Sequence, residues 1–474
     1  MSTIIDLEGK PLLPGEEQAT SSAPRNWWKP VAVATSVALA LSGAVVGSSL
    51  HAAGGAATTK LAGTDMAGEV AMKKIVYGDM SPDDVKSLFH KFQSNFGRAY
   101  EDEAEEDFRF MVFKKNLMFI DALNKQHAYA LFSVTQFADY TEDERGTMRL
   151  SEEYASWDKM KARMPDHVVE AAAQGPDGVL TRDETTGTLV GMEWMQSGQV
   201  SWSSPDDCAA CKMYPGFEDY SYDSMPTDFD WRALGAVTAV KNQKYCGSCW
   251  TFSTAADLEG TRYLATGTLE SLSEQQLVAC DTLNYGCDGG YPFAAMQYIE
   301  SFGGLVSDES YPYRGICAWD ACGQDIYYGT PTCDTDTLND ELRNGSVAHI
   351  GGWQVVAMGA DYEDLMAITL LKNGPISIAF NANGMDYYVH GVMGCSSESY
   401  CEAGGIDEHS PCDPTYLDHA VLIVGYGTQD DVDYWVIKNS WGTEWGEEGY
   451  YRIVKGENHC GVANFAVHSV VKGA

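Results

Sequence analysis

The sequence predicts an α+β fold, in which a helical front segment precedes a compact domain of helices and strands. Apolar residues recur at helical spacing between residues 80 and 145. From Met225 onward, the composition becomes that of a compact domain, and a helical pattern begins near Cys249. The alternating runs AVLIVGYG, DYWVIKNSW and GYYRIVKG follow it and are typical of strands.

Charge and cysteine content exclude two broad classes of protein. The formal net charge of −37 opposes binding to nucleic acid, whose phosphates would be repelled, and it suits mildly acidic surroundings. Thirteen cysteines are too many for a typical reduced cytosolic protein. We therefore expect an oxidising, secretory route and no nucleic-acid partner.

An uncharged run near the amino terminus predicts a membrane anchor over residues 30–51. The run reaches the roughly 20 residues that a helix needs to cross a bilayer. Arg25, Trp27, Trp28 and Lys29 precede it, as expected of a cytosolic boundary. We predict a type II precursor with a cytosolic tail (residues 1–29) and a lumenal body. A cleaved signal peptide, and so a secreted protein, is the alternative.

A short pattern in that tail bears on the destination. Glu8, Leu12 and Leu13 form ExxxLL, which resembles the acidic dileucine signal that sorts membrane proteins to lysosomes or vacuoles. The alternative is an arbitrary disordered tail.

The next two stretches differ in their periodicity. Ser81 and Pro82 suit the start of a first helix, and a second one is expected from about residue 101 to 127. Alone, this pattern indicates only a helical hairpin. Residues 146–224 lack long periodic runs, which indicates a linker or surface extension. Cys208 and Cys211 within it favour a small disulfide over a zinc knuckle, because no second CxxC stands at zinc-ribbon distance.

The stretch YCGSCW contains Cys246 and Cys249, whose spacing suits a metal site, a redox couple, or a structural cysteine beside a reactive one. A catalytic cysteine needs a lowered pKa, a base, a group that orients the base, and a donor for the oxyanion. Cys249 stands where a helix begins, and the helix amino end favours a thiolate there. Cys246 would not share that benefit equally.

Three separate blocks resemble papain-like cysteine proteases of the cathepsin L type. They are QKYCGSCW, LDHAVLIVGYG and YWVIKNSWGTEWG, in this order along the chain. The resemblance implies a two-lobed peptidase domain (residues 225–474), with a helical left lobe and an antiparallel, β-barrel-like right lobe. It also implies the site: Cys249 as nucleophile, His419 as its proton partner, Asn439 as the orienter of the imidazole, Gln243 as an oxyanion donor, and Trp441 as a shield over the Asn439–His419 hydrogen bond.

The same resemblance implies a set of disulfides and leaves Cys249 free. Cys246 pairs with Cys287, Cys280 with Cys317 or Cys322 (we take Cys322), and Cys412 with Cys460. A Cys395–Cys401 loop is an additional hypothesis. The partners of Cys208, Cys211 and Cys333, and of Cys317, stay open.

The second front helix carries a pattern that matches the ERFNIN motif of cathepsin L-type propeptides: Glu105, Arg109, Phe113, Asn116, Ile120 and Asn124. Ser133, Thr135, Phe137 and Asp139 resemble the second propeptide motif, without its usual Gly and Asn. The resemblance implies that residues 80–145 are an inhibitory propeptide, which lies in the cleft in the nonproductive direction and loosens in acid. We expect the maturation cut just before Pro226.

The residues implied for substrate binding are mostly apolar. Gly289 and Gly290 would form the strip on which a peptide lays its backbone, and a specificity pocket would be lined by Tyr291, Pro292, Ala379, Leu417, Ala420 and Phe465. We expect Leu, Phe or Val at the second residue before the cut. Nothing between Gly394 and Pro411 resembles the paired histidines of a carboxypeptidase-type loop, so endopeptidase activity is favoured.

Together these features predict an acid-compartment cysteine endopeptidase made as a zymogen, monomeric when mature and without a cofactor or metal. Its partners would be protein and peptide substrates, its own propeptide and, before maturation, the membrane. Asn344 begins an Asn-Gly-Ser glycosylation sequon. The rival hypotheses are a noncatalytic binding protein with the same fold, and a redox or metal protein that uses its CxxC pairs.

Overall fold

The computed structural model describes residues 74–166, 169, 181–182, 189–190, 225–315, 333–345, 347–394 and 412–471. The predicted anchor and tail lie outside these ranges, as do Cys208, Cys211, Cys317, Cys322, Cys395 and Cys401. Within the described residues, no helix combines the length and apolar character that a membrane span needs.

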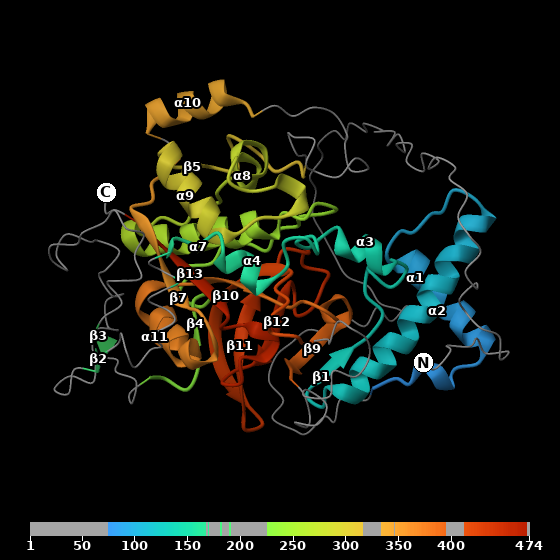
Figure 1. Cartoon of the computed structure of the whole chain (residues 1–474). Coiled ribbons are helices and arrows are strands. Elements are labelled where there is room, and N and C mark those ends of the chain that lie inside the picture. Colours follow the sequence, from blue (N-terminus) through green and yellow to red (C-terminus); the bar gives the residue numbers. More distant parts are fainter. Residues whose placement is uncertain are drawn as a thin grey trace, which may run out of the picture. The chain divides into compact units, whose positions relative to one another are not determined.

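Two helices, α1 (Pro82–Asn95) and α2 (Glu103–Gln126), follow the short 3₁₀ helix η1 (Tyr77–Asp79), and the two were predicted (Figure 1). The Ser81 side chain accepts a hydrogen bond from the backbone N–H of Asp84 and so caps α1. The buried side of α2 includes Phe113 and Ile120. Phe108, which fits the same helical stripe in the sequence, is 43% exposed and lies on the outer side.

The helices of the carboxy-terminal domain (residues 225–471) begin with α7 (Cys249–Thr266), which is buried continuously from Cys249 to Thr261. Gly267, with φ of +74°, ends it in the left-handed conformation that glycine adopts without strain. The other helices are α8 (Glu274–Cys280), α9 (Pro292–Phe302), α10 (Thr335–Asn344) and α11 (Glu363–Asn373), and the front segment adds the short α3 (Glu142–Gly146) and α4 (Trp157–Lys161).

A nine-stranded sheet has the order β1-β9-β12-β11-β10-β8-β13-β7, with β4 also paired to β10 (Figure 1). All pairs are antiparallel except β9 with β12. The strands predicted from alternation are β10, β11 and β12. The bounds are β1 (Ala130–Phe132), β4 (Phe229–Asp230), β7 (Gly352–Ala357), β8 (Ile376–Phe380), β9 (Tyr388–Met393), β10 (His419–Gln429), β11 (Val432–Lys438), β12 (Tyr450–Val454) and β13 (Phe465–Val470); β2 (Thr181–Arg182) pairs with β3 (Leu189–Val190), and β5 (Leu305–Val306) with β6 (Val347–Ala348).

Helix α7 is fastened to the sheet by buried polar side chains. The Ser253 hydroxyl donates to the Val421 carbonyl in β10 at 2.7 Å, and the Asp257 carboxylate accepts from the Ser469 N–H in β13 at 2.8 Å. Buried polar groups must be paired in this way to avoid a desolvation cost. The start of α7 therefore lies against the sheet, and the α+β fold with a helical part and a sheet part is confirmed.

The front segment contributes an edge strand to this sheet. Ala130 pairs with Gly391 and Phe132 with Tyr388, which joins β1 to β9. Because β1 follows α2 directly, this pairing holds the front helices against the carboxy-terminal domain.

Candidate active site

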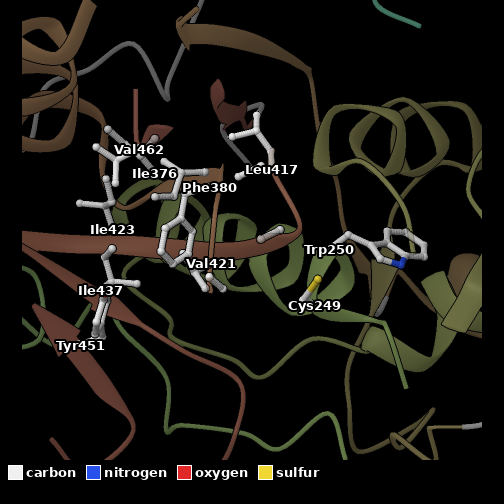
Figure 2. Packing of buried hydrophobic residues seen from close by; sticks show 14 of the residues in the cluster. Cys249, Trp250, Ile376, Phe380, Leu417, Val421, Ile423, Ile437, Tyr451 and Val462 are labelled. Atoms are coloured by element: carbon white, nitrogen blue, oxygen red, sulfur yellow. The ribbon is translucent and has the colours of Figure 1, made fainter. Parts of the chain in front are cut away.

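Cys249 is the first residue of α7, and its side chain is only 2% exposed. It is the free cysteine among those described. Figure 2 shows its sulfur at the start of the helix, among buried apolar residues. The sulfur faces the backbone N–H of Ala420, which directly follows His419.

His419 and Asn439 come from neighbouring strands. His419 begins β10, and Asn439 follows the end of β11, its antiparallel neighbour. The His419 Nε2 atom and the Asn439 side-chain oxygen are 2.8 Å apart. The Trp441 ring stacks on the imidazole with 4.9 Å between centroids and an angle of 30°. Cys249, His419 and Asn439, which are distant in the sequence, therefore lie close together in the fold, and Trp441 covers the His419 ring.

Burial opposes charge on both reacting groups in this form of the protein. Burial raises the pKa of Cys249 to about 12 and lowers that of His419 to about 4. Between these values, the sulfur carries its proton and the imidazole is uncharged. His419 Nδ1 has no hydrogen-bond partner among the described residues, so it is available to a proton on a neighbouring group.

Gln243 is fixed beside this site. Its side-chain oxygen accepts from the Ser440 hydroxyl at 2.6 Å. Its Nε2 donates to the carbonyl oxygens of Met148, at 2.7 Å, and Cys246, at 2.9 Å. The amide that the sequence predicts to be an oxyanion donor is therefore bonded to a carbonyl of the chain's own front segment.

Residues 148–151 run through the site. Leu150 donates its N–H to the Asp418 carbonyl at 2.7 Å, and Ser151 donates to the Asp288 carbonyl at 3.3 Å. A Cβ on Gly289, whose φ is +119°, would come within 2.2 Å of the Leu150 side chain. Glycine is needed there for close approach of the two backbones. The sequence pattern indicated a linker from residue 146, whereas residues 148–151 pack against Gln243, Asp288, Gly289 and Asp418 of the carboxy-terminal domain.

The six residues expected to line the apolar pocket are all buried. Ala379 pairs with Ala420 and also with Phe465, which brings these three together in the sheet. The Tyr291 hydroxyl donates to the Tyr154 carbonyl at 3.1 Å. The Trp157 ring lies 6.5 Å from that of Phe465. The front segment thus covers this region as well as the reacting groups. A Cβ on Gly290 would come within 2.6 Å of the Trp250 ring.

The six-residue motif on α2 forms specific contacts. Arg109 bonds both carboxylate oxygens of Glu144, at 2.7 and 2.8 Å, and its Nε lies 3.7 Å from Glu105. Asn116 donates to the Ala138 and Tyr140 carbonyls, and Asn124 both donates to and accepts from the Phe132 backbone. Phe113 and Ile120 are fully buried. The polar members thus fix the chain that follows the helix, and the apolar members fill the core.

The second motif contacts the carboxy-terminal domain. Ser133 donates its N–H to the Tyr387 carbonyl, and the Thr135 hydroxyl donates to the Asp386 carbonyl at 2.7 Å. Phe137 packs edge-on against Trp441, with 5.4 Å between centroids. Asp139 instead pairs within the front segment, with Arg98 at 3.1 Å.

Two of the three expected disulfides are present, and one prediction is wrong. Cys246 is bonded to Cys287, and Cys412 to Cys460. Cys280 is bonded to Cys333 rather than to Cys317 or Cys322, because Cys333 lies just before α10 with its Cα 5.0 Å from that of Cys280. Since Cys246 is in a disulfide, the pair in YCGSCW cannot act as a dithiol redox couple or a two-thiolate metal site.

Sequence reasoning missed several residues that the fold brings to the site. Arg149 is one of them, with its guanidinium against Asp386 and Asp418. An isolated arginine in a nonperiodic stretch gives no signal for such a contact. Asp418 stands beside His419 in the sequence, so its proximity could have been noted.

Comparison with known proteins agrees with this geometry. Residues 225–470 match the papain family cysteine protease domain, and residues 89–144 match the cathepsin propeptide inhibitor domain. The chain is 34% identical to cathepsin F of Drosophila melanogaster over 82% of this chain and 51% of that protein. It is 33% identical to cathepsin F of Mus musculus, over 81% of this chain and 64% of that protein. The chain thus spans about half to two-thirds of these two relatives.

Other relatives are covered more fully. Cysteine proteinase 15A of Pisum sativum is 34% identical, over 79% of this chain and 83% of that protein. Among solved structures, digestive procathepsin L2 from Tenebrio molitor superposes with a TM-score of 0.55 at 27% identity, covering 82% of this chain and all of that one.

Proposed function

The chain belongs to the papain family of cysteine proteases, and on this premise we propose that it is a cysteine endopeptidase made as an inactive zymogen. The observation that carries the proposal is the convergence of Cys249, His419 and Asn439 at the start of α7, with Gln243 beside them. The front segment that fills the cleft supports inhibition by the chain's own propeptide.

Removal of residues 148–151 would change the charge state of the site. Water could then reach Cys249 and His419, so burial would no longer penalise their charged forms. The proton would move from the sulfur to the imidazole, and the amino end of α7 would favour the thiolate. Asn439 would orient the imidazolium, and Trp441 would keep water from their hydrogen bond.

The reaction follows from these positions. The Cys249 thiolate attacks the peptide carbonyl, and the oxyanion is stabilised by Gln243 Nε2 and the Cys249 backbone N–H. His419 gives its proton to the leaving amine, which departs and leaves an acyl-enzyme. A water then gives a proton to His419 and attacks the acyl group, which releases the acid product and restores the thiolate and imidazolium.

Further parts of the proposal rest on the sequence pattern. They are the cathepsin L type, the division at residues 80–145, 146–224 and 225–474, and a cut before Pro226. The complete six-residue motif on α2 supports the assignment to the cathepsin L type. Three disulfides in the described part support a secretory route to a lysosome or vacuole. The type II anchor rests on residues outside the described ranges. Asn344 is exposed at the end of α10, which fits glycosylation there.

The test is acid incubation of the purified zymogen and of its Cys249→Ser variant, with chain mass and peptide cleavage followed together. The wild type should shorten and gain activity, whereas the variant should stay inactive. Peptides with Leu, Phe or Val at the second residue before the cut should be cleaved faster than those with Arg. Activity that survives the substitution would overturn the proposal. Absence of both activity and Cys249 labelling by an active-site epoxide at about pH 5 would favour a noncatalytic binding protein.

A further inference from the structure

Two buried carboxylates of the carboxy-terminal domain face one guanidinium of the front segment. The two terminal nitrogens of Arg149 lie 2.5 Å from Asp386 and 3.3 Å from Asp418. Arg145 approaches the same Asp386 oxygen at 3.4 Å. The Asp386 and Asp418 side chains are 2% and 4% exposed. The peptidase domain therefore supplies an acidic site that the front segment fills with cations.

Release of the front segment would leave this site without its cations. Both arginines precede the proposed maturation cut and would leave together. The second Asp386 oxygen has no hydrogen-bond partner among the described residues, whereas Asp418 keeps one from the Ala382 N–H at 2.8 Å. Two carboxylates in a partly desolvated cleft repel each other, so a positive group that enters between them is stabilised.

The acidic site is linked through Trp445 to Trp441, the residue that covers His419. Asp386 belongs to the short 3₁₀ helix η8 (Met385–Tyr387), whose Met385 carbonyl accepts from the Trp445 indole at 3.2 Å. Trp445 packs edge-on against Trp441, with 5.1 Å between centroids. Leu150, by contrast, lies against Gly289 on the other side, toward the apolar pocket.

The direction of the reaction then identifies the subsite. The Met148 carbonyl accepts a hydrogen bond from the Gln243 side-chain amide, which would stabilise the carbonyl under attack in a substrate. Arg149 is the residue that follows Met148. His419, covered by Trp441, is the group that protonates the leaving amine. A substrate side chain that reaches Asp386 therefore belongs to the leaving-group half of the substrate.

We propose that Asp386, together with Asp418, forms a subsite that binds the basic side chain of the first substrate residue beyond the cleaved bond. The inference rests on the proposed function. Arg149 demonstrates that a guanidinium fits between the two carboxylates. The hydrogen bond from Trp445 to the Met385 carbonyl of η8 would hold Asp386 in position after the front segment has left. Planar, charge-assisted hydrogen bonds favour Arg over Lys there.

The test uses the mature enzyme and quenched peptides that differ only in the residue after the cut, namely Arg, Gln or Glu. The cut position is fixed by mass spectrometry. We expect kcat/KM for Arg to exceed that for Gln by roughly tenfold and that for Glu by more, because the site attracts cations and repels anions. Asp386→Asn should reduce the Arg-to-Gln ratio severalfold. Asp361→Asn, at an exposed position with the same change of charge, should leave the ratio unchanged.

Equal rates for the three peptides would overturn the inference even if Asp386→Asn does not fold. So would an Asp386→Asn enzyme with the wild-type ratio, or an Arg preference located before the cut. Failure of the proposed function looks different, since no peptide would then be cleaved and Cys249 would not be labelled.

Discussion

Two contacts that hold the front segment on the peptidase domain differ in what they require of their charges. The arginine contact (Arg149 with Asp386 and Asp418) is an attraction between one guanidinium and two carboxyl groups. The histidine contact (His127 with His459) places two buried rings 6.4 Å apart, with His127 Nδ1 bonded to the Gly394 carbonyl at 2.9 Å. It needs both rings neutral. The front segment is thus attached to the peptidase domain at one place by opposite charges and at another by uncharged rings.

The difference determines how each contact responds to acid. Burial lowers the pKa of His127 to about 4 and that of His459 to about 3, from an ordinary value of 6.5. These pKa values lie below those of the unfolded chain, so the histidine contact contributes fully above about pH 6.5 and is weakened as the pH falls. Burial raises the pKa of Asp418, although Arg149 opposes the rise. Acid therefore removes no stability through Asp418. Of the two contacts, acid weakens the histidine contact, and the buried His419, whose pKa is also lowered to about 4, adds to the same response.

The largest expected effect comes from breaking the arginine contact. In a Cys249→Ser zymogen, which cannot cut itself, Arg149→Ala leaves two buried carboxylates without their shared cation. The free energy of unfolding at pH 7 should fall by about 3 kcal/mol, measured by urea denaturation. Arg163→Ala is the control, because Arg163 is exposed and its guanidinium bonds the Leu283 carbonyl and lies over the Tyr285 and Tyr291 rings, rather than joining two buried carboxylates. Equal unfolding curves for Arg149→Ala and the parent would show that the contact contributes little.

The histidine contact should show its effect only in acid. At pH 5, each histidine that must stay neutral in the folded state costs about 2 kcal/mol relative to the unfolded chain. His127→Phe removes this penalty, so its free energy of unfolding should fall less between pH 7 and pH 5 than that of the parent. The pH of half-maximal processing should shift downward in the Cys249-containing chain.

The control for that experiment is His90→Phe, since His90 is exposed on α1. It should leave both the pH dependence of unfolding and the processing pH unchanged. If the free energy of unfolding depends on pH identically in His127→Phe and in the parent, acid releases the front segment by protonating another group.

The two contacts also mark the limit of what the sequence predicts. The helices, the central strands and the meeting of Cys249 with His419 and Asn439 follow from local periodicity and from motifs. The histidine and arginine contacts do not, because each joins isolated residues far apart in the chain; Arg149 and Asp386 are 237 positions apart. The prediction of a partner for Cys280 failed for the same reason, because sequence spacing alone does not select Cys333 from several cysteines.

Periodicity also overstates burial. Phe108 fits the apolar stripe of α2 but points outward, because only the part of the stripe that meets α1 and the following chain is covered. Whether an apolar side chain is covered depends on the tertiary partner, which the helical pattern does not specify.

The ion pair of Arg109 with Glu144 lies inside the front segment and should respond to acid in a third way. Burial raises the pKa of Glu144, but its hydrogen bonds with Arg109 and Thr141 outweigh this, and the net pKa is lowered. The pair therefore contributes above the ordinary pKa of about 4.5 and loses its contribution as the pH falls below it. Because the carboxylate is 29% exposed, Glu144→Gln should lower the free energy of unfolding by only about 1 kcal/mol at pH 7.

That difference from the parent should shrink below about pH 4, where Glu144 is protonated in the unfolded chain. Glu103→Gln, at an exposed position in the first turn of α2, corrects for the general change of charge. If the Glu144→Gln difference instead disappears between pH 7 and pH 5, this carboxylate shares the acid response that we assign to His127. The histidine contact would then not be the first to weaken.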